Sequence, residues 1–139
     1  MSALAWFRAG GVGMIVVGAM HLSGELAPLP TDPAFVAMRE AMRAYTVNIM
    51  GVETNPQAIQ HDLSLSFSLF SLAVGAIALA SAHALAAASP AALRRVSLVH
   101  VVALAALVVT NAAFRVPPPA VFYTLVAGLF GMAALRARA

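Results

Sequence analysis

His21 and Glu25 are the first residues along the chain whose side chains and spacing are suited to acid–base chemistry. Side chains four residues apart lie on the same face of a helix, so the imidazole and the carboxylate can meet. These are the groups that enzymes use most often to move protons near neutral pH. The alternative is a local hydrogen bond that satisfies a half-buried histidine.

This pair opens a polar segment, residues 21–62, which carries all five acidic residues of the chain. Ionisable groups in or near hydrocarbon are costly, so a functional role is their default interpretation. His61 and Asp62 point about 100° apart on a helix, so they face different neighbours. We expect the segment to form one site, whose candidate catalytic residues are His21, Glu25, His61, Asp62 and Glu53.

Small polar residues continue from His61 along one helical face. Ser64, Ser68, Ser71 and Gly75 fall with His61 in an arc of about 80°. Lipid offers hydroxyl groups no partner, so this face must meet other helices or a cavity. His61 is therefore either part of a reaction site or the donor of a helix-packing hydrogen bond.

The same side chains raise two cofactor hypotheses. His21, Glu25 and His61, joined by Asp62 or Glu53, would give nitrogen and oxygen ligands for zinc, iron or copper. His21 and His61 could instead ligate haem. No H-E-x-x-H or comparable motif accompanies them, so the sequence predicts neither a metal site nor a cofactor.

Arg39 and Arg43 are like charges four residues apart, which costs a few tenths of a kcal/mol unless an anion lies nearby. Their partner is Glu40, a lipid phosphate or an acidic group of a ligand. Met42 offers an adaptable apolar contact. Further polar residues are expected at the same end of the bundle or deeper within it. The candidate ligand-binding residues are Arg39, Arg43, Met42, Tyr45, Ser64, Ser68, His100, Asn111 and Tyr123.

The composition indicates a membrane protein. Of 139 residues, 62% are hydrophobic and 9% are charged, which is more apolar surface than a soluble domain of this size can bury. The basic residues are all arginines, typical of helix ends at a membrane surface rather than of nucleic-acid binding. With no cysteine, disulfides, thiol redox chemistry and thiolate metal sites are excluded.

The predicted fold is an all-α, four-transmembrane-helix bundle with a short amphipathic interfacial helix between the first and second spans. Asp32 as N-cap and Pro33 at the first helical position predict where that interfacial helix starts. The first span follows Arg8 without an A-x-A-like cleavage site, so we expect it to be retained. The single integral membrane domain, 1–139, has spans at about 6–26, 57–87, 91–114 and 120–136 and an interfacial helix at about 33–50.

The arginines also predict an orientation. Four spans place both termini on one side, together with Arg8, Arg94, Arg95, Arg136 and Arg138. The opposite side receives Arg39, Arg43 and Arg115. Since cytoplasmic loops carry the excess of basic residues, we expect both termini in the cytoplasm, the protein in the cell inner membrane and the polar segment outside.

The run from Phe7 to Leu22, FRAGGVGM followed by GAMHL, resembles the first helix of DoxX-like small bacterial membrane proteins. The resemblance implies a four-helix inner-membrane bundle, in a group whose members sometimes act as oxidoreductase subunits. The H-x-x-x-E pair of His21 and Glu25 is similar to an arrangement in membrane sterol isomerases, where a histidine and carboxylates handle a proton and a carbocation. The sequence departs from that family in the position of its single tryptophan, Trp6, which lies at the other end of the helix.

Together these patterns predict a membrane-embedded enzyme that performs acid/base isomerisation or cyclisation of a hydrophobic small molecule at the outer-facing mouth of the bundle. The alternative is a non-catalytic subunit, or a lipid- or quinone-binding module, of a larger membrane complex. The expected partners are the lipid bilayer, a hydrophobic small molecule, and either further copies of the chain or a larger complex. No nucleic acid is expected.

Overall fold

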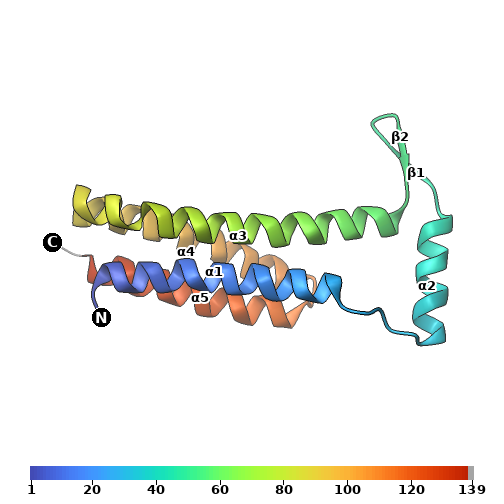
Figure 1. Ribbon diagram of the computed structural model, residues 1–139, viewed down its shortest axis with the longest axis horizontal. Helices are drawn as coiled ribbons and strands as arrows, with labels where there is room; N and C mark the ends of the chain where they lie inside the picture. Colours follow the sequence, from blue (N-terminus) through green and yellow to red (C-terminus); the bar gives the residue numbers. More distant parts are fainter. Residues whose placement is uncertain (138–139) are drawn as a thin grey trace. The chain divides into compact units, whose positions relative to one another are not determined.

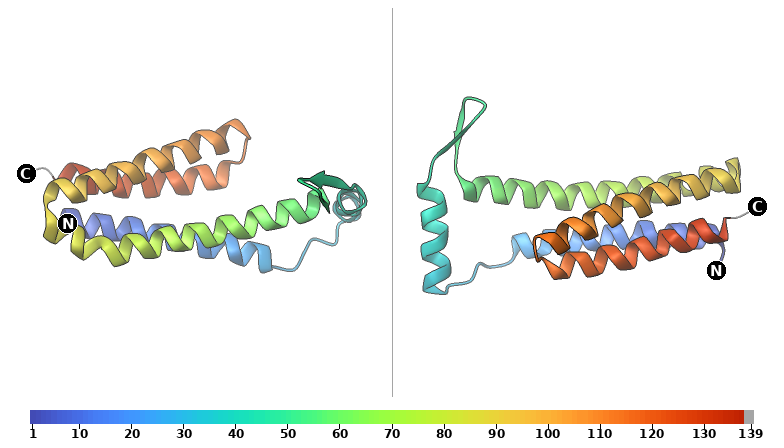
Figure 2. Two further views of the ribbon diagram at one scale, coloured as in Figure 1. Left: turned by 90° about the horizontal axis from the view of Figure 1, so that it is seen from above. Right: turned by 180° about the vertical axis from the view of Figure 1, so that it is seen from behind.

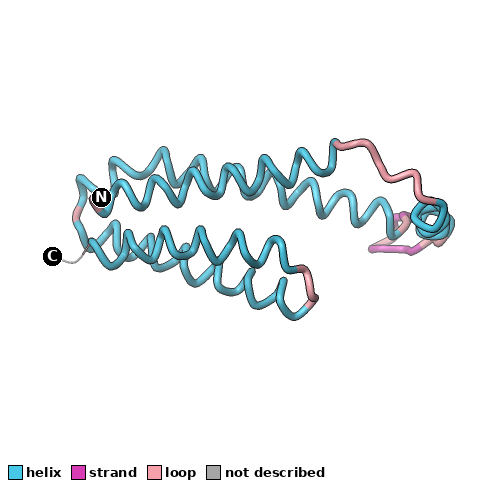
Figure 3. The backbone as a smooth tube through the Cα atoms, turned by 90° about the horizontal axis from the view of Figure 1, so that it is seen from below, coloured by secondary structure: helices cyan, strands magenta, loops and turns pink. Residues whose placement is uncertain are grey.

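The computed structural model describes residues 1–137, which form helices and one small hairpin (Figures 1 and 3). The helices are α1 (Ala3–Leu26), α2 (Pro33–Ala44), α3 (Pro56–Ala88), α4 (Pro90–Ala113) and α5 (Pro117–Arg136), and the strands are β1 (Val47–Ile49) and β2 (Val52–Thr54). Helices α1, α3, α4 and α5 are long and apolar enough to cross a membrane. The predicted fold class is therefore confirmed, and the chain is a multi-pass membrane protein.

The helix boundaries follow from local sequence signals. Proline is the first residue of α2, α3, α4 and α5, a position where its missing N–H is not needed and its fixed φ suits a helix. Asp32, Asn55 and Ser89 each accept a hydrogen bond from the backbone N–H three residues ahead, at 2.9–3.0 Å. These caps satisfy donors that the first helical turn leaves unpaired. The predicted spans differ most from the helices at two starts. Helix α1 begins at residue 3 and not at about 6, and α5 begins at residue 117 and not at about 120.

Helix α2 is shorter than the sequence analysis predicted, because it ends at Ala44 and not near residue 50. Tyr45 adopts an extended conformation, with φ −82° and ψ 113°. From there the residues are mainly aromatic or β-branched, types that fit a strand better than a helix. The interfacial helix predicted at about 33–50 therefore extends only to residue 44.

Gly51 lies in the turn of a hairpin. Strands β1 and β2 pair antiparallel, with Asn48 opposite Glu53. Met50 and Gly51 both have positive φ, 53° and 89°, as the two central residues of a type I′ turn require. The Asn48 side chain accepts the Gly51 N–H at 2.9 Å, which holds the turn closed.

The chain divides into two compact units. Unit 1 combines Met1–Val17 with the chain from Ser71 onward, and unit 2 is Gly18–Phe70. Arg138, one of the arginines that predicted the orientation, lies outside the described residues.

Unit 1 is a bundle in which the first part of α1, the second part of α3, and helices α4 and α5 lie alongside one another (Figure 2). The N-terminus, the α3–α4 turn and the end of α5 share one end of this unit, and the α4–α5 turn lies at the other. Its core contains Phe7, Tyr123 and Phe130, all fully buried. The His100 ring stacks on Phe130, with 4.3 Å between ring centroids.

Unit 2 contains the last turns of α1, helix α2, the hairpin and the first turns of α3. Helix α2 runs transverse to the other two helices (Figure 1). No residue of α2 is buried, and its sequence separates apolar from charged faces. All the side chains of the candidate site described below belong to unit 2.

Candidate functional site

Unit 2 holds a hydrogen-bonded chain of four side chains, two from α1 and two from α3. The Ser64 hydroxyl lies 2.9 Å from His21 Nε2 and 2.5 Å from Glu25 Oε1. The other carboxylate oxygen, Glu25 Oε2, lies 3.1 Å from His61 Nδ1. The order along this relay is therefore His21, Ser64, Glu25, His61.

The protons of the relay can be assigned from its donors and acceptors. A serine hydroxyl has one proton to donate and two lone pairs that accept. Ser64 donates to Glu25, at the 2.5 Å distance expected between a hydroxyl and an ionised carboxylate. The Ser64 oxygen must then accept from His21 Nε2–H. Glu25 also accepts from His61 Nδ1–H, so each contact has one donor and one acceptor.

The relay runs from a more enclosed end to a more exposed one. The His21 ring meets the Phe67 ring edge to face, with centroids 5.2 Å apart. Ser68 is fully buried and donates to the Ser64 carbonyl at 3.0 Å. At the other end the Glu25 side chain is 27% exposed and the His61 side chain 57%. His61 is therefore the member of the relay most accessible from outside.

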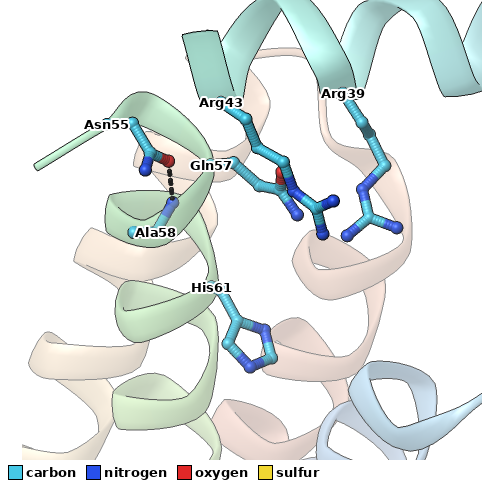
Figure 4. A pocket seen from close by; sticks show the side chains of 6 residues that line it. All are labelled: Arg39, Arg43, Asn55, Gln57, Ala58 and His61. Carbon is cyan, nitrogen blue, oxygen red and sulfur yellow. Dashed lines mark hydrogen bonds between the residues drawn. The ribbon is translucent and has the colours of Figure 1, made fainter. Parts of the chain in front are cut away.

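His61 lines two pockets of unit 2. The larger, here called the arginine pocket, has a volume of about 490 Å³ and is lined by Arg39, Arg43, Asn55, Gln57, Ala58 and His61 (Figure 4). The smaller, here called the glutamate pocket, has a volume of about 210 Å³. Its lining includes Glu25 and His61 together with the apolar side chains of Leu29, Phe35 and Met38. The acid–base pair thus borders a partly apolar space.

Helix α2 supplies both arginines of the arginine pocket, and α3 supplies His61 and Gln57. Figure 4 shows the guanidinium groups of Arg39 and Arg43 extending from α2 in the same direction, on the side where Gln57 and His61 lie. Arg39, Gln57 and His61 line both pockets. The two spaces therefore adjoin along these three side chains.

Of the predicted catalytic residues, the structure brings together His21, Glu25 and His61. His21 and Glu25 are linked through Ser64, rather than by the direct hydrogen bond that their spacing allows. Asp62 is exposed, and within residues 1–137 it forms no ion pair or side-chain hydrogen bond. Glu53 lies on β2, in the exposed hairpin.

The predicted ligand-binding residues are distributed over both units. Arg39, Arg43, Ser64 and Ser68 lie in or beside the site of unit 2. Met42 and Tyr45 also belong to unit 2, where Tyr45 is 65% exposed.

Three further predicted residues belong to unit 1. His100 Nδ1 lies 2.8 Å from the Val96 carbonyl, and Asn111 donates to the Leu107 carbonyl at 2.8 Å. Both contacts satisfy a polar side chain one turn back along its own helix. Tyr123 is fully buried in the core.

Gln57 is a pocket residue that the sequence analysis did not single out. It lies four residues before His61, so both fall on one face of α3. That spacing extends the face of His61 and Ser64 by one turn towards the start of the helix. The signal was present in the sequence, but only the position of α2 makes Gln57 part of a pocket.

Within residues 1–137, no three His, Asp or Glu side chains are grouped closely enough to hold a metal ion. Comparisons with protein-family models, with curated proteins and with solved structures find no match to this chain. The resemblance to DoxX-like proteins is tested by none of them.

Proposed function

We propose that this membrane protein is an enzyme that moves a proton on a hydrophobic small molecule, in an isomerisation or a cyclisation. The observation that carries this proposal is the Glu25–His61 pair, which lines the glutamate pocket and is hydrogen-bonded at 3.1 Å. A carboxylate and an imidazole in contact supply a base and an acid at one place.

In an isomerisation the Glu25 carboxylate removes a proton from an allylic carbon of the substrate. The electron pair of that C–H bond forms a new double bond to the adjacent carbon. The electron pair of the original double bond then takes a proton from protonated His61 at the far carbon. Glu25 then returns its proton to His61 through their hydrogen bond, which restores the starting state. Ser64 and His21 hold the carboxylate in place from its other oxygen.

In a cyclisation the same two groups act in the opposite order. Protonated His61 adds a proton to one double bond, and the resulting carbocation closes onto a second double bond. Glu25 removes a proton from the cyclic cation, and the product leaves with one new carbon–carbon bond. The cyclisation needs apolar side chains around the cation, and Leu29, Phe35 and Met38 would provide them.

We further propose that the protein resides in the inner membrane of a bacterium with both termini in the cytoplasm. The excess of arginine on the side of the termini supports this orientation. The DoxX-like pattern of the first helix supports the assignment to a bacterial membrane. Unit 2 would then work at the outer face, in contact with the lipid bilayer.

Proton transfer at carbon can be detected without knowing the substrate. Membranes from cells that express the protein are incubated in D2O, and the lipid-soluble fraction is analysed by high-resolution mass spectrometry. We expect one or more species to gain carbon-bound deuterium with the wild type. Glu25→Gln should slow this gain by about 100-fold or more, since general acid–base groups contribute about 10²–10⁴ in rate.

The matched control is Glu40→Gln, which makes the same exchange at an exposed residue of α2 and should keep the wild-type labelling. Equal labelling by Glu25→Gln and the wild type would overturn the acid–base assignment. If the wild type labels no species, the alternative of a non-catalytic subunit or a lipid- or quinone-binding module is favoured. In that case the relay would serve to bind a ligand or to join helices.

A further inference from the structure

The arginine pocket is positively charged and has no carboxylate in its lining. Arg39 and Arg43 lie four residues apart on α2, where like charges destabilise a helix. Within residues 1–137 neither guanidinium forms an ion pair. The Arg39 guanidinium carbon lies 5.9 Å from the centroid of the Phe35 ring. Glu40 lines a smaller space with both arginines, but it forms an ion pair with neither within residues 1–137.

The start of α3 adds to the attraction for an anion. Asn55, Gln57 and Ala58 belong to the cap and first turn of this 33-residue helix, and all three line the pocket. Backbone N–H groups at a helix start carry a positive partial charge and favour anions. The Ala58 N–H is donated to the Asn55 side chain, so the helix start contributes its partial charge and not a hydrogen bond from Ala58.

The Gln57 side chain leaves a hydrogen-bond acceptor of the arginine pocket unsatisfied. Its Oε1 atom is buried and has no hydrogen-bond partner among the described residues. Buried polar atoms nearly always have a partner, and one without a partner points to a missing ligand group or water. Figure 4 shows this amide between α3 and the Arg43 side chain. The unsatisfied atom thus lies in the pocket where the two arginines extend.

The neighbouring glutamate pocket supplies a surface of the opposite character. Leu29, Phe35 and Met38 line it with apolar atoms. It shares Arg39, Gln57 and His61 with the arginine pocket. A molecule that filled both spaces would carry an anionic group at one end and an apolar group at the other, with its middle part at His61.

We propose that the arginine pocket binds the phosphate head of an amphiphile whose apolar part occupies the glutamate pocket. Two arginine forks match the several oxygens and the near-double charge of a phosphate monoester better than a single carboxylate. That this amphiphile is the substrate rests on the proposed function, because its middle part would lie against the Glu25–His61 pair. Phosphate binding itself is independent of any reaction.

Binding is measured on the full chain in neutral maltoside micelles by native mass spectrometry, with dodecyl phosphate as the probe. We expect the double variant Arg39→Gln/Arg43→Gln to bind the probe about 10–100-fold more weakly, the usual loss for hydrogen bonds to a charged group. The matched control, Arg94→Gln/Arg95→Gln, removes the same charge from exposed positions on α4 and should bind like the wild type. Arg39→Lys/Arg43→Lys keeps the positive charge but loses the paired N–H donors of the guanidinium groups. Its affinity for dodecyl phosphate should lie between those of the wild type and the glutamine double variant.

Two other probes distinguish the sources of the phosphate. Inorganic phosphate tests the headgroup alone, and dioleoyl phosphatidylglycerol tests a bilayer lipid. Weaker binding of both than of dodecyl phosphate supports the proposal. Equal binding of inorganic phosphate overturns the role of the apolar pocket, and equal binding of phosphatidylglycerol assigns the site to ordinary lipid. Equal binding of dodecyl phosphate by the two glutamine double variants overturns the site.

The two measurements separate this inference from the proposed function, because the binding of dodecyl phosphate in micelles requires no reaction and deuterium incorporation does. If the probe binds as expected but no deuterium is incorporated by the wild type, the enzyme proposal fails and the phosphate site stands. If deuterium is incorporated while the arginine variants bind normally, the phosphate site fails alone.

Discussion

Glu25 of α1 and His61 of α3 are joined by a hydrogen bond of 3.1 Å, although 36 positions separate them in the sequence. The contact joins a carboxylate of α1 to an imidazole of α3, beside a pocket that both residues line. Ser64 connects the second carboxylate oxygen to His21. The acid–base chemistry proposed for this protein depends on this cross-helix arrangement.

Ser64→Ala should release the His21 ring from the relay. In the wild type His21 Nε2 carries the proton that bonds to Ser64, and this proton should exchange slowly with water. Without the hydroxyl we expect exchange about tenfold faster and a loss of about 1 kcal/mol in the free energy of unfolding. Nuclear magnetic resonance of 15N-labelled histidine reports both the tautomer and the exchange rate.

Ser66→Ala is the control for this experiment, because Ser66 is exposed and points away from Ser64 on the same helix. It should leave the His21 signals unchanged. If His21 carries its proton on Nδ1 in the wild type, the direction assigned to the relay is wrong.

Gly51→Ala should destabilise the hairpin. The φ of Gly51 is 89°, and an L-residue with a Cβ pays about 1–2 kcal/mol in a left-handed conformation. We expect the amides of residues 45–55 to exchange hydrogen roughly tenfold faster, measured by mass spectrometry. Gly24→Ala, on α1 where an added Cβ meets no atom within 4 Å, should have no such effect. Unchanged hairpin exchange would contradict the positive φ.

Gly75→Ala should weaken the packing of unit 1. A Cβ at Gly75 would lie 2.6 Å from the Gly11 carbonyl oxygen, a backbone atom that cannot move aside without shifting α1. We expect a loss of about 1–3 kcal/mol in the free energy of unfolding, as overpacking usually costs. Thermal unfolding in detergent, followed by circular dichroism, measures it. Gly128→Ala, with nothing within 4 Å of the added Cβ, should be neutral or slightly stabilising; equal melting temperatures for the two variants would show that the α1–α3 approach is looser.

Single cysteines can test the orientation, because the chain has none of its own. Met50 is 99% exposed at the tip of the hairpin, and Ala88 is exposed at the end of α3. With the termini in the cytoplasm, a membrane-impermeant maleimide should label Met50→Cys in intact cells and Ala88→Cys only after permeabilisation. The reverse labelling pattern would invert the proposed topology.

The sequence by itself determined the four spans, the starts of two of them to within one residue, and three of the four side chains of the relay. Apolar length decides whether a helix can cross a bilayer, and proline after a capping residue decides where it begins. Both are local properties, so α3 was predicted within one residue at each end. His21, Glu25 and His61 were found because charged and titratable groups are rare in such a chain.

Local sequence patterns did not predict the structure where two segments pair or pack against each other. The stretch after Ala44 has apolar spacing that suits a helix, but pairing between Val47–Ile49 and Val52–Thr54 makes it a hairpin. Helical periodicity places a residue on a face, yet it does not say how far one helix is rotated or shifted against another. Only the tertiary structure could therefore decide that Ser64 stands between His21 and Glu25, and that α2 brings two arginines to Gln57 and His61.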